Sequence, residues 1–162
     1  SGAVYDGRIK LPVGGLAHGS ESVARTVRHE YAHAAIVTLS RSRAPVWLNE
    51  GLAQVAEEVN EAGRAGRLRM ALAEGGLAPL SSLENGFTQL GREDASLAYA
   101  EAYFAADYLL RKKGGYNVRR LLEALATAAT IDDAFRQTLS LPYEDFERQF
   151  LRDIAQRVGL AN

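Results

Sequence analysis

The segment VRHEYAHAAI, residues 27–36, contains two of the chain's three histidines. Side chains four positions apart in an α-helix differ by about 40° in direction, so His29 and His33 would project from the same face, one turn apart. Glu30 lies about 100° around the helix from His29, from where its carboxylate could reach a water beside a bound ion. The alternative is that both histidines lie on an exposed helix face and bind nothing. The spacing favours a helical metal site.

A third metal ligand is expected shortly after this helix. Pro45 ends the connection, and the segment VWLNEGLAQVAEEVN (residues 46–60) resumes a helical pattern. Two helices joined by a short connection are usually antiparallel neighbours, which brings Glu50 back toward the histidines. By itself Glu50 could be a surface glutamate near a helix start, where the helix dipole favours it. Catalytic zinc commonly takes three protein ligands and leaves one position for water, so the three residues form a candidate set.

Composition narrows the classes of function. The chain has 162 residues, 47% of them apolar, which suffices for one ordinary domain. Nineteen basic against 20 acidic residues give a net charge of −1, which argues against nucleic acid or an anionic membrane as the main partner. Without cysteine there are no disulfides and no thiolate ligands, so a metal must be held by histidine and carboxylate. We predict one Zn²⁺ ion, because two imidazoles, one carboxylate and an open position suit it.

The remaining elements indicate a mainly α protein. The segment VYDGRIKLPV (residues 4–13) has β-branched and aliphatic residues around a turn, and we expect an edge strand or short hairpin there. The predicted class is therefore α+β, mainly α with a small β element. We expect one domain over residues 1–162, cut from a longer protein, because Ser1 and Gly2 are typical of an engineered start. Its parts are an edge strand and loop (1–19), metal-site helices (20–60), a helix at 64–75, a loop at 77–91, and C-terminal helices (94–157) at 94–113, 116–129, 131–139 and 143–157.

HEYAH followed by APVWLNEGLA resembles the gluzincin metallopeptidases. The closer resemblance is to bacterial peptidase-MA-like domains, in which a YDGRI strand precedes the HExxH helix and WLxEGLA follows it. The similarity extends into the C-terminal helices. It implies a zincin-like metallopeptidase fold that hydrolyses peptide bonds, with His29, His33 and Glu50 as zinc ligands and Glu30 as general base.

The resemblance also implies a tyrosine that stabilises the reaction's oxyanion. It places Tyr99, in the segment AYAEAY, at that position. Tyr103 is one turn further on the same face of the expected helix, so it remains a candidate for the same role. Either tyrosine could instead be an ordinary core aromatic.

Departures from the wider clan refine the expected activity. The Gly-x-Met-Glu-Asn motif that holds a free amino group in zinc aminopeptidases is absent, so endopeptidase action is favoured. Gln54 stands where thermolysin-like members have an aspartate that orients a ligand histidine. Another group must therefore orient the histidine, and the candidates are Glu57, Glu58, Asp107 or a backbone carbonyl. His18, in a glycine-rich loop, is expected to be solvent exposed.

The expected partner is a peptide or protein substrate. An extended peptide could pair with the predicted edge strand near Arg8–Leu11, because an edge strand offers unpaired backbone groups. The competing function is a non-catalytic, zinc-stabilised module that binds peptides or a partner protein without cutting them. The presence of Glu30 favours an enzyme, since a binding module does not need that carboxylate. The sequence leaves side-chain preference and cellular compartment open.

Overall fold

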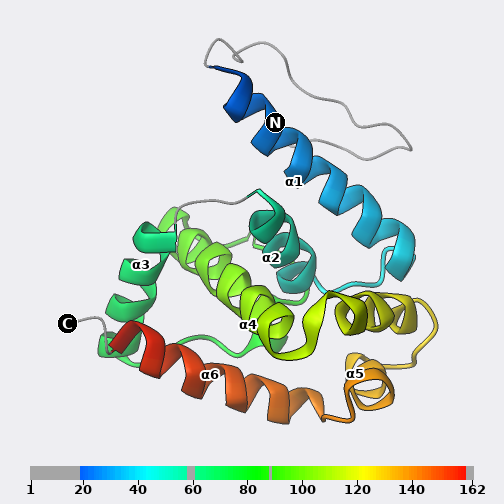
Figure 1. The fold of residues 1–162 in the computed structure, drawn as a ribbon. Coiled ribbons are helices and arrows are strands. Elements are labelled where there is room, and N and C mark those ends of the chain that lie inside the picture. The colour runs from blue at the N-terminus through cyan, green and yellow to red at the C-terminus, as the bar shows by residue number, and fades with distance from the viewer. Residues whose placement is uncertain (1–18, 58–60, 88, 160–162) are drawn as a thin grey trace.

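The computed structural model describes residues 19–57, 61–87 and 89–159. This part of the chain folds into six α-helices and one 3-10 helix (Figure 1). They are α1 (Gly19–Ser40), α2 (Val46–Ala56), α3 (Glu61–Glu74), η1 (Leu80–Leu83), α4 (Arg92–Leu125), α5 (Ile131–Leu139) and α6 (Tyr143–Gly159).

The α+β prediction is wrong. The described residues contain helices and no strand, so this part of the chain is all-α. The expected β element rested on residues 4–13, which lie outside the described residues. In the described ranges the core is built mainly where helices meet, because each helix turns an apolar side toward α4 or toward a helix that packs on it, and Phe87 from the loop before α4 joins this core.

Helix α4 is the centre of the bundle, and each of the other five α-helices packs against it (Figure 1). Many of its buried residues are small, including Ala98, Ala102 and Ala106, which lets neighbouring helices approach closely. Helix α6 covers it with an apolar stripe of buried residues at four-residue intervals: Phe146, Phe150, Ile154 and Val158. The position of α4 therefore fixes the positions of the other helices.

The sequence placed most of the helix boundaries correctly. The structure interrupts α4 at Gly114, where φ is 77° and ψ is 156°, which matches the predicted division between residues 113 and 116. The predicted helix over 131–139 is confirmed, and it begins with a capping box between Thr130 and Asp133. The segment predicted to run to residue 129 ends earlier, at Leu125, because the backbone forms a turn there. None of the described helices has the length and apolar character needed to cross a membrane.

A buried carboxyl group lies in the middle of α4. Glu101 is 1% exposed, and its Oε1 has no hydrogen-bond partner among the described residues. Burial raises the pKa of Glu101 to about 8; the nearby charge of Glu147 acts in the same direction, and a hydrogen bond from the backbone of Ala78 opposes it. The group is therefore mostly protonated at neutral pH.

This buried group makes stability depend on pH. An ordinary glutamate titrates near 4.5, as Glu101 does in the unfolded chain, whereas the folded chain keeps the proton up to about pH 8. Because the folded state binds the proton more tightly, the free energy of unfolding should fall as pH rises from 4.5 to 8, by up to about 1.4 kcal/mol per pH unit. Glu101→Gln should remove this dependence, as measured by urea unfolding across that pH range. The exposed-site variant Glu74→Gln should keep the wild-type slope, and equal slopes for all three proteins would contradict the prediction.

Candidate metal centre

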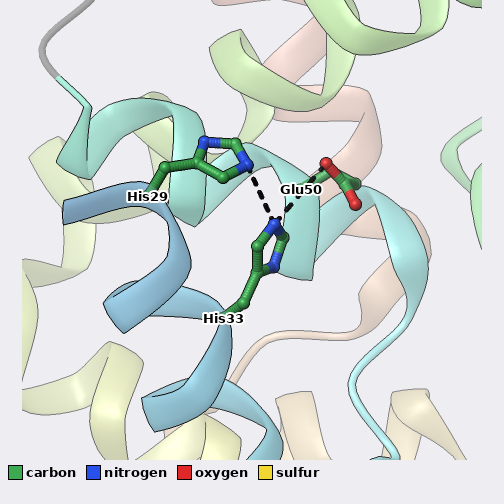
Figure 2. A group of neighbouring side chains, drawn as sticks. All are labelled: His29, His33 and Glu50. Atoms are coloured by element: carbon green, nitrogen blue, oxygen red, sulfur yellow. Dashed lines mark hydrogen bonds and ion pairs between the residues drawn. The ribbon is translucent and has the colours of Figure 1, made fainter. Parts of the chain in front are cut away.

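Three side chains from two helices converge on one point. His29 and His33 lie one turn apart on α1, and Glu50 lies near the start of α2 (Figure 2). The Nε2 atoms of His29 and His33 are 3.0 Å apart, and His33 Nε2 is 3.9 Å from Glu50 Oε2. One ligand atom from each residue lies within 4.8 Å of the other two. Two nitrogens bound to one tetrahedral zinc are separated by roughly 3.3 Å, so this group is positioned for metal binding.

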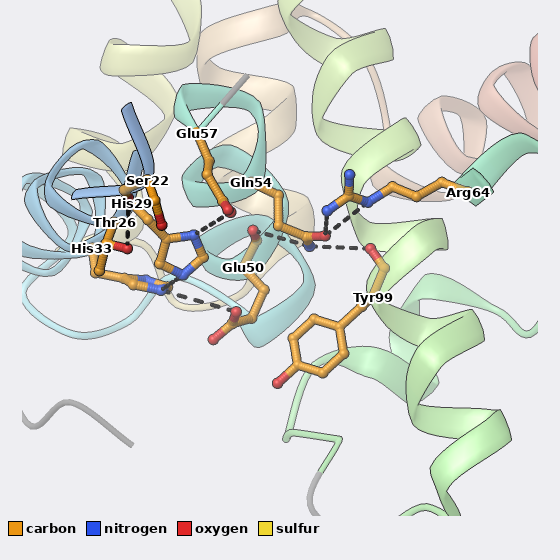
Figure 3. A network of polar contacts seen from close by, with 9 residues as sticks. All are labelled: Ser22, Thr26, His29, His33, Glu50, Gln54, Glu57, Arg64 and Tyr99. Carbon is orange, nitrogen blue, oxygen red and sulfur yellow. Dashed lines mark hydrogen bonds and ion pairs between the residues drawn. The ribbon is translucent and has the colours of Figure 1, made fainter. Parts of the chain in front are cut away.

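The Nδ1 atoms of both imidazoles already have hydrogen-bond partners. His29 Nδ1 donates to Glu57 Oε2 at 3.2 Å (Figure 3), and His33 Nδ1 donates to Asn49 Oδ1 at 3.0 Å. Since carboxylate and amide oxygens are acceptors, each Nδ1 carries a hydrogen, and a neutral ring in that tautomer presents the lone pair of Nε2. Two lone pairs that face one another at 3.0 Å repel unless a cation lies between them. The donor set therefore fits a cation such as zinc.

Helix α2 is held firmly in the place that brings Glu50 to the histidines. Trp47 is fully buried, and its Nε1 donates to the hydroxyl of Tyr143 on α6 at 2.8 Å. A Cβ atom added at Gly51 would lie 2.2 Å from the carbonyl oxygen of Ala102 and 2.8 Å from Ala106 Cβ. The backbone of α2 thus rests directly on α4, and only glycine fits at residue 51 without a shift of one helix.

A polar chain continues from the metal centre toward α3. Gln54 is buried, and its Nε2 donates to the backbone carbonyls of Glu50 at 3.3 Å and of Tyr99 at 3.1 Å. The Gln54 Oε1 accepts two hydrogen bonds from Arg64, at 2.9 and 3.2 Å (Figure 3). Gln54 therefore links α2, α3 and α4 beside the site.

The structure separates the two candidate tyrosines. Tyr99 is 41% exposed; burial raises its pKa and the charge of Glu50 adds to the rise, so its hydroxyl is within electrostatic reach of the metal group. Figure 3 shows its ring on the same side as the Glu50 carboxylate. Tyr103 is 9% exposed, and its pKa is raised by burial and then by the charges of Glu61 and Asp107. Tyr99 faces the site, whereas Tyr103 packs into the core.

The other predicted residues are distributed as follows. Glu30 is half-buried on α1 directly after His29, and it is not one of the three converging residues. Of the expected histidine partners, Glu57 contacts His29, while Asp107 instead pairs with Arg111 and Arg157. Glu58, His18 and Arg8–Leu11 lie outside the described residues.

Sequence reasoning missed Asn49 as the partner of His33. Asn49 immediately precedes Glu50 in the segment WLNEG, so a polar residue beside the candidate ligand was the available signal. It could not be interpreted from sequence because the contact depends on how α2 approaches α1. Asn49 and Glu57 together fix the orientation of both rings.

A known protein family matches most of the chain. The family model described as Peptidase MA superfamily matches residues 12–154, which include all three converging residues. No curated protein and no solved structure matches the chain.

Proposed function

Because the chain belongs to the peptidase MA superfamily, we propose that it is a gluzincin-type zinc metallopeptidase that hydrolyses internal peptide bonds. The observation that carries this proposal is the convergence of His29, His33 and Glu50, with ring nitrogens oriented for a cation. Two histidines from one helix and a glutamate from the next match the ligand pattern of that clan, as the resemblance of HEYAH and WLNEG implied.

These three residues would hold the zinc, and Glu30 and Tyr99 would carry out the proton transfer and charge stabilisation. A bound zinc ion supplies Lewis-acid chemistry, polarising a carbonyl and lowering the pKa of a water. Glu30 accepts the proton of the attacking water and passes it to the leaving amine. Tyr99 donates its phenolic hydrogen to the oxyanion that develops on the peptide carbonyl, a role supported by its exposure and by its electrostatic contact with Glu50.

The expected roles of Asn49 and Glu57 in this function follow from their contacts with the two histidines. Each holds one histidine in the tautomer that presents Nε2 to the metal, and Glu57 also adds negative charge behind His29. Endopeptidase action is proposed because the chain lacks the motif that captures a substrate's free amino group. A peptide with a blocked amino terminus should therefore be a substrate.

Metal removal tests the proposal. The purified protein should contain one zinc per chain and cleave a denatured protein; a chelator should abolish cleavage, and added zinc should restore it. His33→Ala should bind no zinc and show no cleavage, because it removes one of the converging ligand atoms. Zinc content is read by elemental analysis and cleavage by mass spectrometry. Cleavage that resists the chelator would refute the metallopeptidase, and stoichiometric zinc without any turnover would identify a binding module instead.

A further inference from the structure

The side chain of Tyr99 packs against a second aromatic ring. The ring of Phe87 meets it edge to face, with the two centroids 4.9 Å apart and an angle of 87° between the ring planes. Aromatic pairs prefer this geometry, because the positive edge of one ring meets the negative face of the other. Phe87 is buried, whereas Tyr99 is 41% exposed. The buried ring therefore supports the more exposed one.

Phe87 belongs to a segment, residues 80–87, that is anchored to two helices other than α4. At its start, the backbone N–H of Leu80 donates to the carboxylate of Glu147 on α6. Further along, the carbonyl oxygen of Glu84 accepts a hydrogen bond at 3.0 Å from the backbone N–H of the first residue of α2. These contacts fix the backbone on both sides of α4, so the Phe87 ring is presented to Tyr99 from a well-defined position.

The backbone of Tyr99 is fixed separately from its ring. Its carbonyl oxygen accepts a hydrogen bond from Gln54 Nε2 at 3.1 Å, and Gln54 lies one turn after Glu50 on α2. This bond holds residue 99 beside the metal centre but does not select one of the staggered rotamers of the side chain. In the observed rotamer, burial and then the charge of Glu50 raise the pKa of Tyr99, so the hydroxyl lies within electrostatic reach of that carboxylate.

From these contacts we propose that Phe87 is a positioning residue for the oxyanion-binding tyrosine, because it holds the Tyr99 ring on the side of the Glu50 carboxylate (Figure 3). The inference rests on the proposed peptidase function and adds to that site a residue from outside the HEYAH and WLNEG motifs. A hydrogen-bond donor stabilises a developing charge best when it is already in place before the reaction. Without the Phe87 ring, Tyr99 reaches the oxyanion in only part of its rotamers.

The kinetic test introduces Phe87→Leu into two zinc-loaded proteins, the wild type and Tyr99→Phe. Leucine is also apolar but has no aromatic ring. In the wild type, kcat for a blocked peptide should fall about 3- to 10-fold with KM unchanged, as expected when one aromatic contact that acts on the transition state is lost. Tyr99→Phe has no hydroxyl to position, so the same substitution should leave its kcat unchanged. A fall of equal size in both proteins, or no fall in the wild type, would overturn the inference.

The matched control is Phe150→Leu on α6. Phe150 is also buried and also packs on a tyrosine, Tyr108, with ring centroids 6.0 Å apart. The substitution should lower the free energy of unfolding, because it leaves a gap in the core, but it should keep the wild-type kcat. Urea unfolding of all variants separates this general loss of stability from the specific effect of Phe87 on the reaction.

A second measurement does not depend on peptidase activity. The protein is labelled with 3-fluorotyrosine, and the ¹⁹F NMR signal of Tyr99 is identified by its absence in Tyr99→Phe. Phe87→Leu should change the fluorine relaxation rates of Tyr99, because the ring gains motion, and Phe150→Leu should leave them unchanged. If the wild type cleaves no peptide, the proposed function fails, and this measurement alone decides whether Phe87 holds the ring. Equal relaxation of Tyr99 in the wild type and in Phe87→Leu would overturn the inference.

Discussion

Glu30→Gln is expected to lower kcat for peptide hydrolysis by about 10²- to 10⁴-fold while the zinc content stays at one per chain. Glutamine keeps the size and polarity of the side chain but cannot accept the proton of the attacking water. Glu30 is not one of the three converging ligand residues, so its replacement leaves the metal group intact. The measurement pairs initial rates on a blocked peptide with elemental analysis of the same protein sample.

The control for this variant is Glu21→Gln, on the same helix and at an exposed position. It makes the same change of charge on α1 without touching the site, so it should retain wild-type kcat. A Glu30→Gln protein that hydrolyses peptides at the wild-type rate would remove Glu30 from the mechanism. Loss of zinc from that variant would instead show that Glu30 contributes to metal binding, which also contradicts the role proposed for it.

Gly51→Ala is expected to destabilise the fold by about 1–3 kcal/mol or more. The new methyl group would meet the Ala102 carbonyl oxygen at 2.2 Å, so α2 must move away from α4. Because Glu50 precedes this residue directly, the same movement should carry it away from the histidines and weaken zinc binding. Urea unfolding measures the first effect, and competition with a zinc chelator measures the second.

Gly66→Ala on α3 is the matched control, because an added Cβ there meets nothing within 4 Å. Alanine is the better helix former, so this variant should be more stable than the wild type by about 0.5–1 kcal/mol, with unchanged zinc affinity. An unfolding midpoint for Gly51→Ala at or above that of the wild type would show that α2 can shift freely. In that case the close contact with α4 would not position Glu50.

The helices were predictable from local signals. The breaks at Pro45 and Gly114 and the cap at Thr130 act within a few residues, so they identify helix ends without knowledge of the packing. The predicted class was wrong because the described residues contain no strand, and a local run of β-branched residues does not specify the partner that a strand requires. The run on which the β element was predicted, at residues 4–13, lies outside the described residues, and all regular elements of the described residues are helices.

The sequence alone determined that His29 and His33 share one helix face, because α-helical hydrogen bonding fixes the direction of residues four apart. It also placed a glutamate near the start of the next helix, and the short connection between the two helices brings that glutamate back toward the histidines. Only the tertiary structure decided how near Glu50 comes, which partners hold the two rings, and that Tyr99 faces the group while Tyr103 packs inside. Those features depend on how closely α2 packs on α4 and crosses α1. Such packing results from contacts between residues far apart in the chain, which local spacing does not specify.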